Sequence, residues 1–393
     1  MIVKGIGLNI FIHLYGFLKI AGYLASKANS VYKKNAREKI ISYNEFSRLL
    51  LVWNRKKNSR QMPWKGEKDP YKIWLSEIIL QQTRVEQGLK YYQNFIKAFP
   101  TIHQLANTPD KEIYKLWEGL GYYTRCKNLI TTSRYIANKL KGKFPETFHE
   151  LKKLKGIGPY TASAIASFAF DQPHAVVDGN VFRVLARTFG INKPIDTAVG
   201  KKTFTNLAND LLYKKQPGLY NQAIMDFGAV ICKPIAPSCQ NCPFNKTCYA
   251  YINESINRLP VKEKKIRIKK RWFNYFMLEY NNRIIIRQRT KKDIWQQLFE
   301  FPMIESESEK SPENLLSSDN NGLVKKNLFD IIEISPLYKQ QLSHQLILAR
   351  FLKVHLKKKT PIVSGYHWVK KQQLFHYAFP RIIRTYMHEK GLI

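Results

Sequence analysis

The stretch "LKGIGPYTASAIASFAF" (154–170) decides the fold that we expect of this chain. Its Gly-x-Gly is not of the dinucleotide-binding kind, because the residues before it, "FHELKKLKG", have a helical pattern and no strand precedes them. We therefore predict a helix, a tight turn and a second helix, with Gly156 and Gly158 allowing unusual dihedral angles and a close backbone approach. Pro159 suits the first position of the second helix.

This turn is also a candidate phosphate site. The start of the second helix leaves backbone N–H groups free to bind an anion, and Lys152, Lys153 and Lys155 lie beside it. The whole chain is basic, with a formal net charge of +36 over 393 residues, so polyanions are the first class of partner to consider. We interpret the stretch as a helix–hairpin–helix that grips phosphate; the alternative is an ordinary helical turn.

Residues 43–256 around this turn are expected to form one helical domain. Runs such as 71–99 and 181–189 place apolar residues three and four positions apart, with short Gly and Pro breaks between them, which predicts about ten helices. Residues 1–42 precede this domain as an extension of unknown role, since polar residues interrupt their apolar run before the roughly 18 residues that a membrane-spanning helix needs. A signal peptide, an amphipathic extension and translation from upstream of the true start all remain open for it. We expect a cytoplasmic, nucleoid-associated bacterial protein.

The pattern changes after the helical domain. Residues 257–271 contain the basic run "PVKEKKIRIKKR" and are predicted to be a linker. In 272–393, apolar runs around Asn281 and Asn282 indicate a hairpin, a second hairpin is indicated by 341–356, and 306–322 is a polar loop. We therefore expect a separate C-terminal α+β domain.

Four of the five cysteines lie in "CKPIAPSCQNCPFNKTC" (232–248), with the spacing Cys-x6-Cys-x2-Cys-x5-Cys. Disulfides, zinc and an iron–sulfur cluster would each imply a different protein. Disulfide-stapled domains are usually small and secreted, whereas this chain has ample apolar mass. The cluster of cysteines therefore indicates metal ligands, namely Cys232, Cys239, Cys242 and Cys248.

Two carboxylates stand out as candidates for chemistry. Glu77 lies in an apolar helical stretch, where burial would raise its pKa toward the range of a general acid; a solvated surface glutamate is the alternative. Asp178 precedes a helical run, so it is either a plain N-cap or a carboxylate that stabilises a cation, and the two roles are compatible.

Together these motifs resemble the MutY-type adenine DNA glycosylases of the helix–hairpin–helix superfamily. The resemblance covers residues 46–250 and rests on "MPWKGEKDPYKIWLSEIILQQTR", "WEGLGYYTRCKNL", "LKGIGPYTA", "VVDGNVFRVLAR" and the cysteine loop. It implies a mainly α fold with a [4Fe–4S] loop, in which the four cysteines hold the cluster. Only one short Cys-x2-Cys pair is present, whereas zinc sites usually have two.

The resemblance also implies the roles of individual residues. Glu77 is the acid that protonates N7 of adenine, and Asp178 stabilises the oxocarbenium-like sugar by its charge or by a transient covalent bond. Tyr160 and Asn180 match active-site positions that hydrogen-bond the acid, the base or the sugar. Gln82 and Tyr122 match residues that wedge into the duplex. Relatives with lyase activity carry a lysine at the position of Tyr160, so we expect a monofunctional glycosylase.

The C-terminal domain more weakly resembles the Nudix-like module that such enzymes use to read 8-oxoguanine. The resemblance rests on 294–305 and 368–380, and it makes Ser343 and His344 the lesion readers; an ordinary hairpin pair is the alternative. Leu342 stands where the family usually has an aromatic residue. No hydrolase helix is evident after 294–305, so we do not expect pyrophosphatase activity.

The implied substrate is double-stranded DNA with adenine opposite 8-oxoguanine or guanine. We expect a monomer with no obligate protein partner and no small-molecule cofactor beyond the cluster. Two other functions remain open at this point: a bifunctional glycosylase–lyase for oxidised pyrimidines, which Tyr160 disfavours, and a non-catalytic iron–sulfur DNA-binding protein, which the pairing of Glu77 with Asp178 disfavours.

Overall fold

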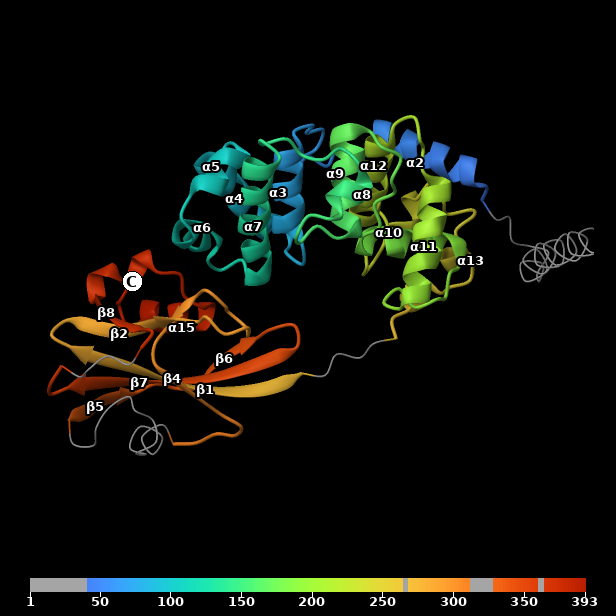
Figure 1. Ribbon diagram of the computed structural model, residues 1–393. Coiled ribbons are helices and arrows are strands. Elements are labelled where there is room, and N and C mark those ends of the chain that lie inside the picture. Colours follow the sequence, from blue (N-terminus) through green and yellow to red (C-terminus); the bar gives the residue numbers. More distant parts are fainter. Residues whose placement is uncertain (1–40, 264–267, 312–327, 360–363) are drawn as a thin grey trace, which may run out of the picture.

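The computed structural model describes residues 41–263, 268–311, 328–359 and 364–393 (Figure 1). The predicted extension 1–42 and the polar loop 306–322 lie largely outside the described residues. Within the described ranges, no helix has both the length and the apolar character needed to cross a membrane.

The N-terminal half is helical, as expected, and its helices occupy the blue to green part of Figure 1. They are α2 (Tyr43–Lys57), α3 (Pro70–Leu80), α4 (Val85–Ala98), α5 (Ile102–Asn107), α6 (Asp110–Trp117), α7 (Tyr123–Lys139), α8 (Phe148–Leu151), α9 (Pro159–Phe170), α10 (Gly179–Phe189), α11 (Ala198–Leu211), α12 (Pro217–Val230) and α13 (Tyr249–Ile252). The predicted run 71–99 is two helices, because the chain turns at residues 81–84 between α3 and α4.

Two buried clusters divide this helical domain. One includes residues of α3 to α7 and α9, and the other includes residues of α2, α10, α11 and α12. Helix α9 lies between them, since it packs against α3 on one side and α12 on the other. The arrangement places Tyr160 of α9 and Asp178, the N-cap of α10, near Glu77 in the second half of α3.

The helix–hairpin–helix turn has the predicted form with one difference. Pro159 begins α9 as predicted, and Gly156 has φ +82°, where a side chain would also bring a Cβ to 2.6 Å from Cβ of Asn128. Gly158 has an ordinary extended backbone, with φ −86° and ψ 178°, so the prediction of an unusual dihedral angle is wrong there. A Cβ at Gly158 would meet nothing within 4 Å, so its backbone is open to close approach from outside.

The described residues of the C-terminal domain form an eight-stranded mixed sheet with helix α15 (Arg381–Glu389). The strands are β1 (Lys269–Tyr280), β2 (Arg283–Gln288), β3 (Phe299–Glu300), β4 (Met303–Ser306), β5 (Phe329–Ile334), β6 (Tyr338–Gln341), β7 (Gln345–Leu356) and β8 (Tyr366–Lys370). Their order is β3-β2-β1-β7-β5, with β1 and β7 parallel, and β4, β6 and β8 pairing with β1, β7 and β2.

The first predicted hairpin is present in this sheet, and the second lies partly outside its predicted range. Asn281 and Asn282 turn the chain between β1 and β2 with φ 43° and 58°, the left-handed values that asparagine tolerates. Strands β6 and β7 form a hairpin around the turn 342–344. The prediction of two strands within 341–356 is wrong, because 345–356 is the single strand β7 and the other strand, β6, precedes it. Strand β1 already begins at Lys269, so the last three residues of the predicted linker 257–271 belong to the sheet.

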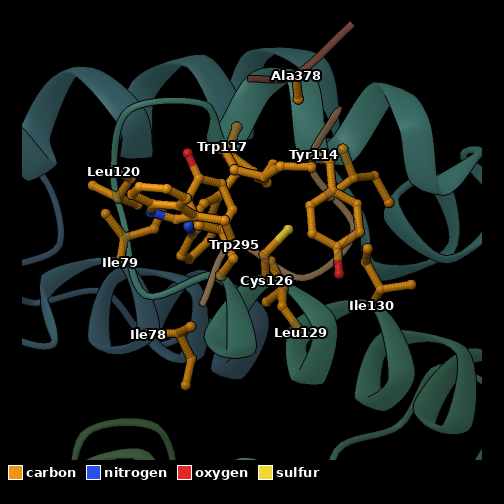
Figure 2. Packing of buried hydrophobic residues seen from close by; sticks show 14 of the residues in the cluster. Ile78, Ile79, Tyr114, Trp117, Leu120, Cys126, Leu129, Ile130, Trp295 and Ala378 are labelled. Carbon is orange, nitrogen blue, oxygen red and sulfur yellow. The ribbon is translucent and has the colours of Figure 1, made fainter. Parts of the chain in front are cut away.

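The two domains share a buried interface. In the view of Figure 1 the sheet lies below α6 and α7, and α15 lies on the face of the sheet toward them. Figure 2 shows Trp295 and Ala378 of the C-terminal domain among Tyr114, Trp117 and Cys126 of the helical domain, and all five belong to one apolar cluster. Trp295 reaches this position from a left-handed backbone, φ 60°, which is strained for so large a residue.

Candidate active site

Glu77 is a buried acid in the second half of α3. The residues from Ile73 to Ile79 are all buried, and Glu77 is only 6% exposed. Burial raises the pKa of Glu77 to about 7, a hydrogen bond from Tyr160 lowers it, and the charge of Asp178 raises it. At neutral pH this carboxyl is therefore divided between its protonated and ionised forms, the state that suits a general acid.

Tyr160 lies beside Glu77 because α9 packs against α3. Its hydroxyl donates a hydrogen bond to the Glu77 carboxyl, and burial together with the charges of Glu77 and Asp178 raises the pKa of Tyr160 well above its ordinary value. Tyr160 therefore remains a neutral donor at physiological pH. The start of α9 thus places Tyr160 against the buried Glu77, while the turn before it lies at the protein surface.

Asp178 is the N-cap of α10. Its Oδ1 accepts a hydrogen bond from the backbone N–H of Val181 at 2.8 Å, and its Oδ2 accepts one from Nδ2 of Asn180 at 2.7 Å. Burial raises the pKa of Asp178, and these two bonds lower it. The cap therefore fixes the direction of a second carboxylate close to Glu77, and both of the roles weighed for Asp178 are compatible with this geometry.

Asn180 joins Asp178 to the cysteine loop. Its Oδ1 accepts from Nη2 of Arg183 at 2.8 Å, and Nε of Arg183 donates to the carbonyl oxygen of Cys232 at 2.7 Å. Gly228 of α12 permits this packing, because a Cβ there would lie 2.6 Å from Cβ of Asn180. A continuous hydrogen-bonded path therefore runs from the active-site carboxylate to the first cysteine.

The four cysteines of the loop line a common cavity next to α10 and α12. None of them forms a disulfide, and burial and then the charges of the neighbouring cysteines raise the pKa of Cys242 to about 12, although a backbone N–H lowers it. Arg187 reaches Sγ of Cys232 at 3.6 Å, and the backbone N–H of Phe244 donates to Sγ of Cys242 at 3.4 Å. Such donors are typical around metal-bound thiolates.

The described residues contain no group of three or more His, Cys, Asp or Glu side chains placed to hold a single metal ion. The cysteine residues nevertheless fit a larger sulfur-bridged group. Four thiols surround one cavity, N–H groups point at two of the sulfurs, and Arg187 ties the loop to α10 by donating to the carbonyl oxygens of Lys233 and Pro234 at 2.7 and 3.1 Å.

Gln82 and Tyr122 lie on exposed turns that Arg125 joins. Both have left-handed backbones, with φ 54° and 49°, and Tyr122 is 43% exposed. Nη1 of Arg125 donates to the carbonyl oxygens of Ile78 and Gln81 at 2.7 and 2.6 Å, and its guanidinium lies 5.2 Å from the centre of the Tyr122 ring. The C-terminal end of α3 and the turn that holds Tyr122 are therefore fixed to each other.

Ser343 and His344 meet this surface from the other domain. They form the turn between β6 and β7, both are exposed, and Oγ of Ser343 is hydrogen-bonded to the hydroxyl of Tyr122. A cavity of about 460 Å³ lies beside this contact, lined by residues 119–124 of the helical domain and 340–345 of the C-terminal domain. The candidate wedge residue and the candidate lesion readers are thus brought together.

Comparison with known proteins now assigns the family. The model of the HhH-GPD superfamily of base excision DNA repair proteins matches residues 75–207, and that of the NUDIX domain matches 274–389. An adenine DNA glycosylase of Buchnera aphidicola subsp. Baizongia pistaciae is 37% identical over 304 residues, which are 76% of this chain and 83% of that protein. The chain belongs to the adenine DNA glycosylase family.

Further relatives agree with this family. An adenine DNA glycosylase of Buchnera aphidicola subsp. Schizaphis graminum is 40% identical over 65% of this chain and 74% of that protein. The solved structure of a thermostable thymine-DNA glycosylase matches with a TM-score of 0.50 and 30% identity, covering 54% of this chain and 97% of that one. The expected fold, a helix–hairpin–helix glycosylase domain followed by a Nudix-like domain, is confirmed.

The adenine glycosylase family makes this chain an enzyme of base excision repair that acts on DNA. A non-catalytic iron–sulfur protein, one of the alternatives drawn from the sequence, is therefore wrong. Iron–sulfur clusters are typical of this family, although the comparisons do not assign one to this chain.

Sequence reasoning did not identify three charged groups that shape the site. Arg183 and Arg125 are two of them, and the third is Asp226 on α12, whose side chain is 0% exposed. Asp226 is 2.7 Å from Nη1 of Arg60 and 3.1 Å from Nζ of Lys65, so it ties the segment before α3 to α12. An acid in an otherwise apolar helical run was a local sign for Asp226, as it was for Glu77.

Proposed function

We propose that this enzyme removes adenine mispaired with 8-oxoguanine or guanine, by flipping the base and hydrolysing its N-glycosidic bond. The observation that carries the proposal is the buried group of Glu77, Tyr160 and Asp178. It combines a carboxyl whose pKa is about 7 with a second carboxylate that N–H donors hold in place. Enzymes that break a glycosidic bond usually use two carboxyl groups in different environments.

The proposed reaction needs one proton and one water molecule. Adenine must first leave the base stack to reach the buried acid. Glu77 gives its proton to N7 as the C1′–N9 bond breaks, and the bonding electrons leave with the base. Asp178 stabilises the positive charge that develops on the sugar, through its own charge or a transient bond. The oxygen of water then bonds to C1′, and its proton returns to Glu77.

Tyr160 and Asn180 position the two carboxyl groups in this proposal. The Tyr160 hydroxyl donates to Glu77, and Nδ2 of Asn180 donates to Asp178. Each contact orients a carboxyl oxygen and limits its pKa, because both stabilise the ionised form.

We also propose that the enzyme is monofunctional. Strand cleavage of the lyase type requires an amine that forms a Schiff base with the sugar, and Tyr160 stands where the lyase relatives carry that lysine. The product should therefore keep an intact abasic site until alkali or heat is applied. Borohydride trapping of the wild-type protein at the level of a true lyase would contradict this and would favour the bifunctional alternative.

We assign a [4Fe–4S] cluster to Cys232, Cys239, Cys242 and Cys248. The four thiols around one cavity and the N–H groups directed at their sulfurs support it. When bound, the cluster orders the loop; the chain itself carries out the bond cleavage. Purified protein should be brown, with about four irons and labile sulfide per chain, and Cys239→Ser or Cys242→Ser should fold or bind DNA poorly. Colourless protein with one zinc would refute the assignment.

Gln82, Tyr122, Ser343 and His344 are proposed to act on the duplex. The two strained turns of Gln82 and Tyr122 project from the surface beside the acid-bearing helix, and strain of this kind is common at functional sites. The contact between Tyr122 and Ser343 supports a joint reader of the base opposite adenine. Gly156 and Gly158, with the exposed lysines beside them, are proposed to hold the phosphate backbone.

Single-turnover excision tests the function as a whole. The substrates are duplexes with adenine opposite 8-oxoguanine, adenine opposite guanine, and thymine opposite guanine, the last because one structural neighbour is a thymine-DNA glycosylase. Release of adenine from the first two, faster opposite 8-oxoguanine, is expected from a monomeric protein without added cofactor. Release of thymine but not adenine would overturn the proposal.

A further inference from the structure

Glu118 is a buried carboxylate in the interface between the two domains. It directly follows α6, stands four residues before Tyr122, and its side chain is 4% exposed. Burying an ionised carboxylate is costly unless charged or N–H partners surround it. The groups that contact the Glu118 carboxylate therefore indicate which parts of the protein it holds in place.

The main partners of Glu118 come from the other domain. Its Oε1 accepts the backbone N–H of Phe379 at 2.8 Å, and its Oε2 lies 3.0 Å from Nη1 of Arg384 on α15. Lys115 of α6 completes the set at 2.8 Å. The carboxylate thus sits next to the N-terminus of α15, where a negative charge is also favoured by the helix dipole.

Helix α15 in turn supports the turn that carries Ser343 and His344. The backbone N–H of Ile382 is in the first turn of α15, where N–H groups have no partner within the helix, and it donates to Oε1 of Gln340 at 2.9 Å. Gln340 belongs to β6, which ends at Gln341, just before this turn. A short series of contacts therefore leads from Glu118 through α15 and β6 to Ser343.

This series of contacts returns to the helical domain at Tyr122. The hydroxyl of Tyr122 is hydrogen-bonded to Oγ of Ser343, and Tyr122 is separated from Glu118 by only three residues. The cavity of about 460 Å³ lies inside this ring of contacts, with Gly119, Tyr122, Ser343, His344 and Arg381 among its lining residues. The two sides of the cavity are thus held by Glu118 at one end and by Tyr122 with Ser343 at the other.

We propose that Glu118 is a positioning residue that sets which base opposite adenine is accepted, by fixing the Ser343–His344 turn against Tyr122. The proposal rests on the proposed function, because it assumes that this turn reads the opposite base. Glu118 touches neither the base nor the sugar in this account. Glu118 acts by holding the C-terminal domain against the helical domain, so that Ser343 contacts Tyr122.

The test compares single-turnover excision by full-length variants on duplexes with adenine opposite 8-oxoguanine and opposite guanine. Glu118→Gln keeps an acceptor for the N–H of Phe379 but removes the charge that faces Arg384. The ratio of the two rates should fall about tenfold, as expected from loss of one charge-assisted hydrogen bond. Glu112→Gln, at an exposed glutamate of α6, is the matched control and should keep the wild-type ratio.

A second readout separates positioning from general damage to the fold. Hydrogen exchange at the amides of Phe379, Ile382 and residues 342–344 should become faster in Glu118→Gln, whereas exchange in α3 should not change. Arg384→Gln attacks the same pair from the other domain, so it provides the test if Glu118→Gln folds poorly. The double variant should lose little more than either single one, because both remove one interaction.

The outcomes distinguish this inference from the proposed function. A ratio within twofold of wild type in Glu118→Gln, while Ser343→Ala lowers it, would overturn the role of Glu118 and leave the lesion reader standing. An equal loss on both substrates would also overturn it. A wild-type protein with no preference for 8-oxoguanine would remove the proposed lesion reading itself.

Discussion

The hydroxyl of Tyr160 donates a hydrogen bond to the buried carboxyl of Glu77. The two residues lie on helices that are about eighty positions apart in the sequence and pack directly against each other. Because burial favours the neutral acid and the tyrosine favours the ionised one, their balance sets the protonation state of Glu77 near neutral pH. The first predictions test that balance.

Glu77→Gln should abolish adenine release and leave binding to the mispaired duplex nearly unchanged, since an amide cannot donate a full proton to N7. General acid–base assistance is typically worth about 10²–10⁴-fold, and a poor leaving group should push the loss to the upper end. Single-turnover excision and duplex binding are measured on the same preparation, with the exposed Glu86→Gln as control. A variant within threefold of wild type would refute the assignment of Glu77.

The same variant should be more stable than wild type in alkaline solution. The pKa of Glu77 is raised in the folded state from 4.5 to about 7, so the folded protein holds this proton more tightly than the unfolded chain. The contribution of this proton to the free energy of unfolding is fully present below about pH 4.5, and it is lost as the pH rises through about 7.

Glu77→Gln cannot ionise, so the variant does not lose this part of its stability at high pH. Its gain in the free energy of unfolding should be at most about 3 kcal/mol at pH 8 and should shrink toward pH 5. Denaturant unfolding at the two pH values measures it. A difference between variant and wild type that is the same at both would show that the pKa of Glu77 is not raised.

Tyr160→Phe should move the pH dependence of excision. In the wild type the rate should fall as the pH rises through about 7, because Glu77 then loses the proton that it must give. The hydrogen bond from Tyr160 lowers the pKa of Glu77, so its removal should raise that pKa and shift the fall to higher pH. Rate profiles on the adenine–8-oxoguanine duplex measure the shift. A shift to lower pH would contradict the role given to Tyr160.

Asp178→Asn separates the structural and chemical roles of Asp178. Asparagine is as good an N-cap as aspartate, and its oxygen can still accept the N–H of Val181. Its amide nitrogen replaces the oxygen that accepts from Asn180, so the melting temperature should fall only slightly. The charge that would stabilise the sugar cation is lost, so excision should fall by about 10²–10³-fold, as when one electrostatic stabiliser is removed. Asp69→Asn, at the N-cap of α3, is the matched control. Loss of stability with unchanged excision would reduce Asp178 to a cap.

Local patterns in the sequence were enough to predict Glu77 and Asp178 as candidates. Glu77 has apolar neighbours three and four positions away, which indicates burial, and Asp178 stands directly before a helical run. The hairpin at Asn281 and Asn282 was predicted for the same reason, since its chemistry depends on adjacent residues.

The contacts that join these features could not be predicted in this way. Arg183 meets the carbonyl of Cys232 across 49 positions, and Arg60 meets Asp226 across 166. Side-chain pairs this far apart depend on how the helices pack, and no periodicity in one segment encodes them. The same limit applies to Glu118, whose partners in the C-terminal domain lie more than 260 positions away.

The final prediction concerns discrimination by the C-terminal domain. Ser343 and His344 are exposed on the β6–β7 turn, and Ser343 already contacts Tyr122 of the helical domain. If the turn reads the oxidised base, Ser343→Ala with His344→Ala should slow adenine removal opposite 8-oxoguanine more than opposite guanine. The difference should correspond to about 1–3 kcal/mol, the size of one good base-edge contact.

A role in phosphate binding alone predicts a different result for the same double variant. Both substrates would then weaken alike, and the dependence of binding on salt concentration would become shallower. Lys339→Gln on β6 serves as the control, because it removes a nearby positive charge without altering the turn. Measuring excision and binding at two salt concentrations separates the two roles. Equal losses on the two substrates would make the C-terminal domain a clamp on DNA, and the roles of Glu77 and Asp178 would be unaffected, since neither residue contacts the turn.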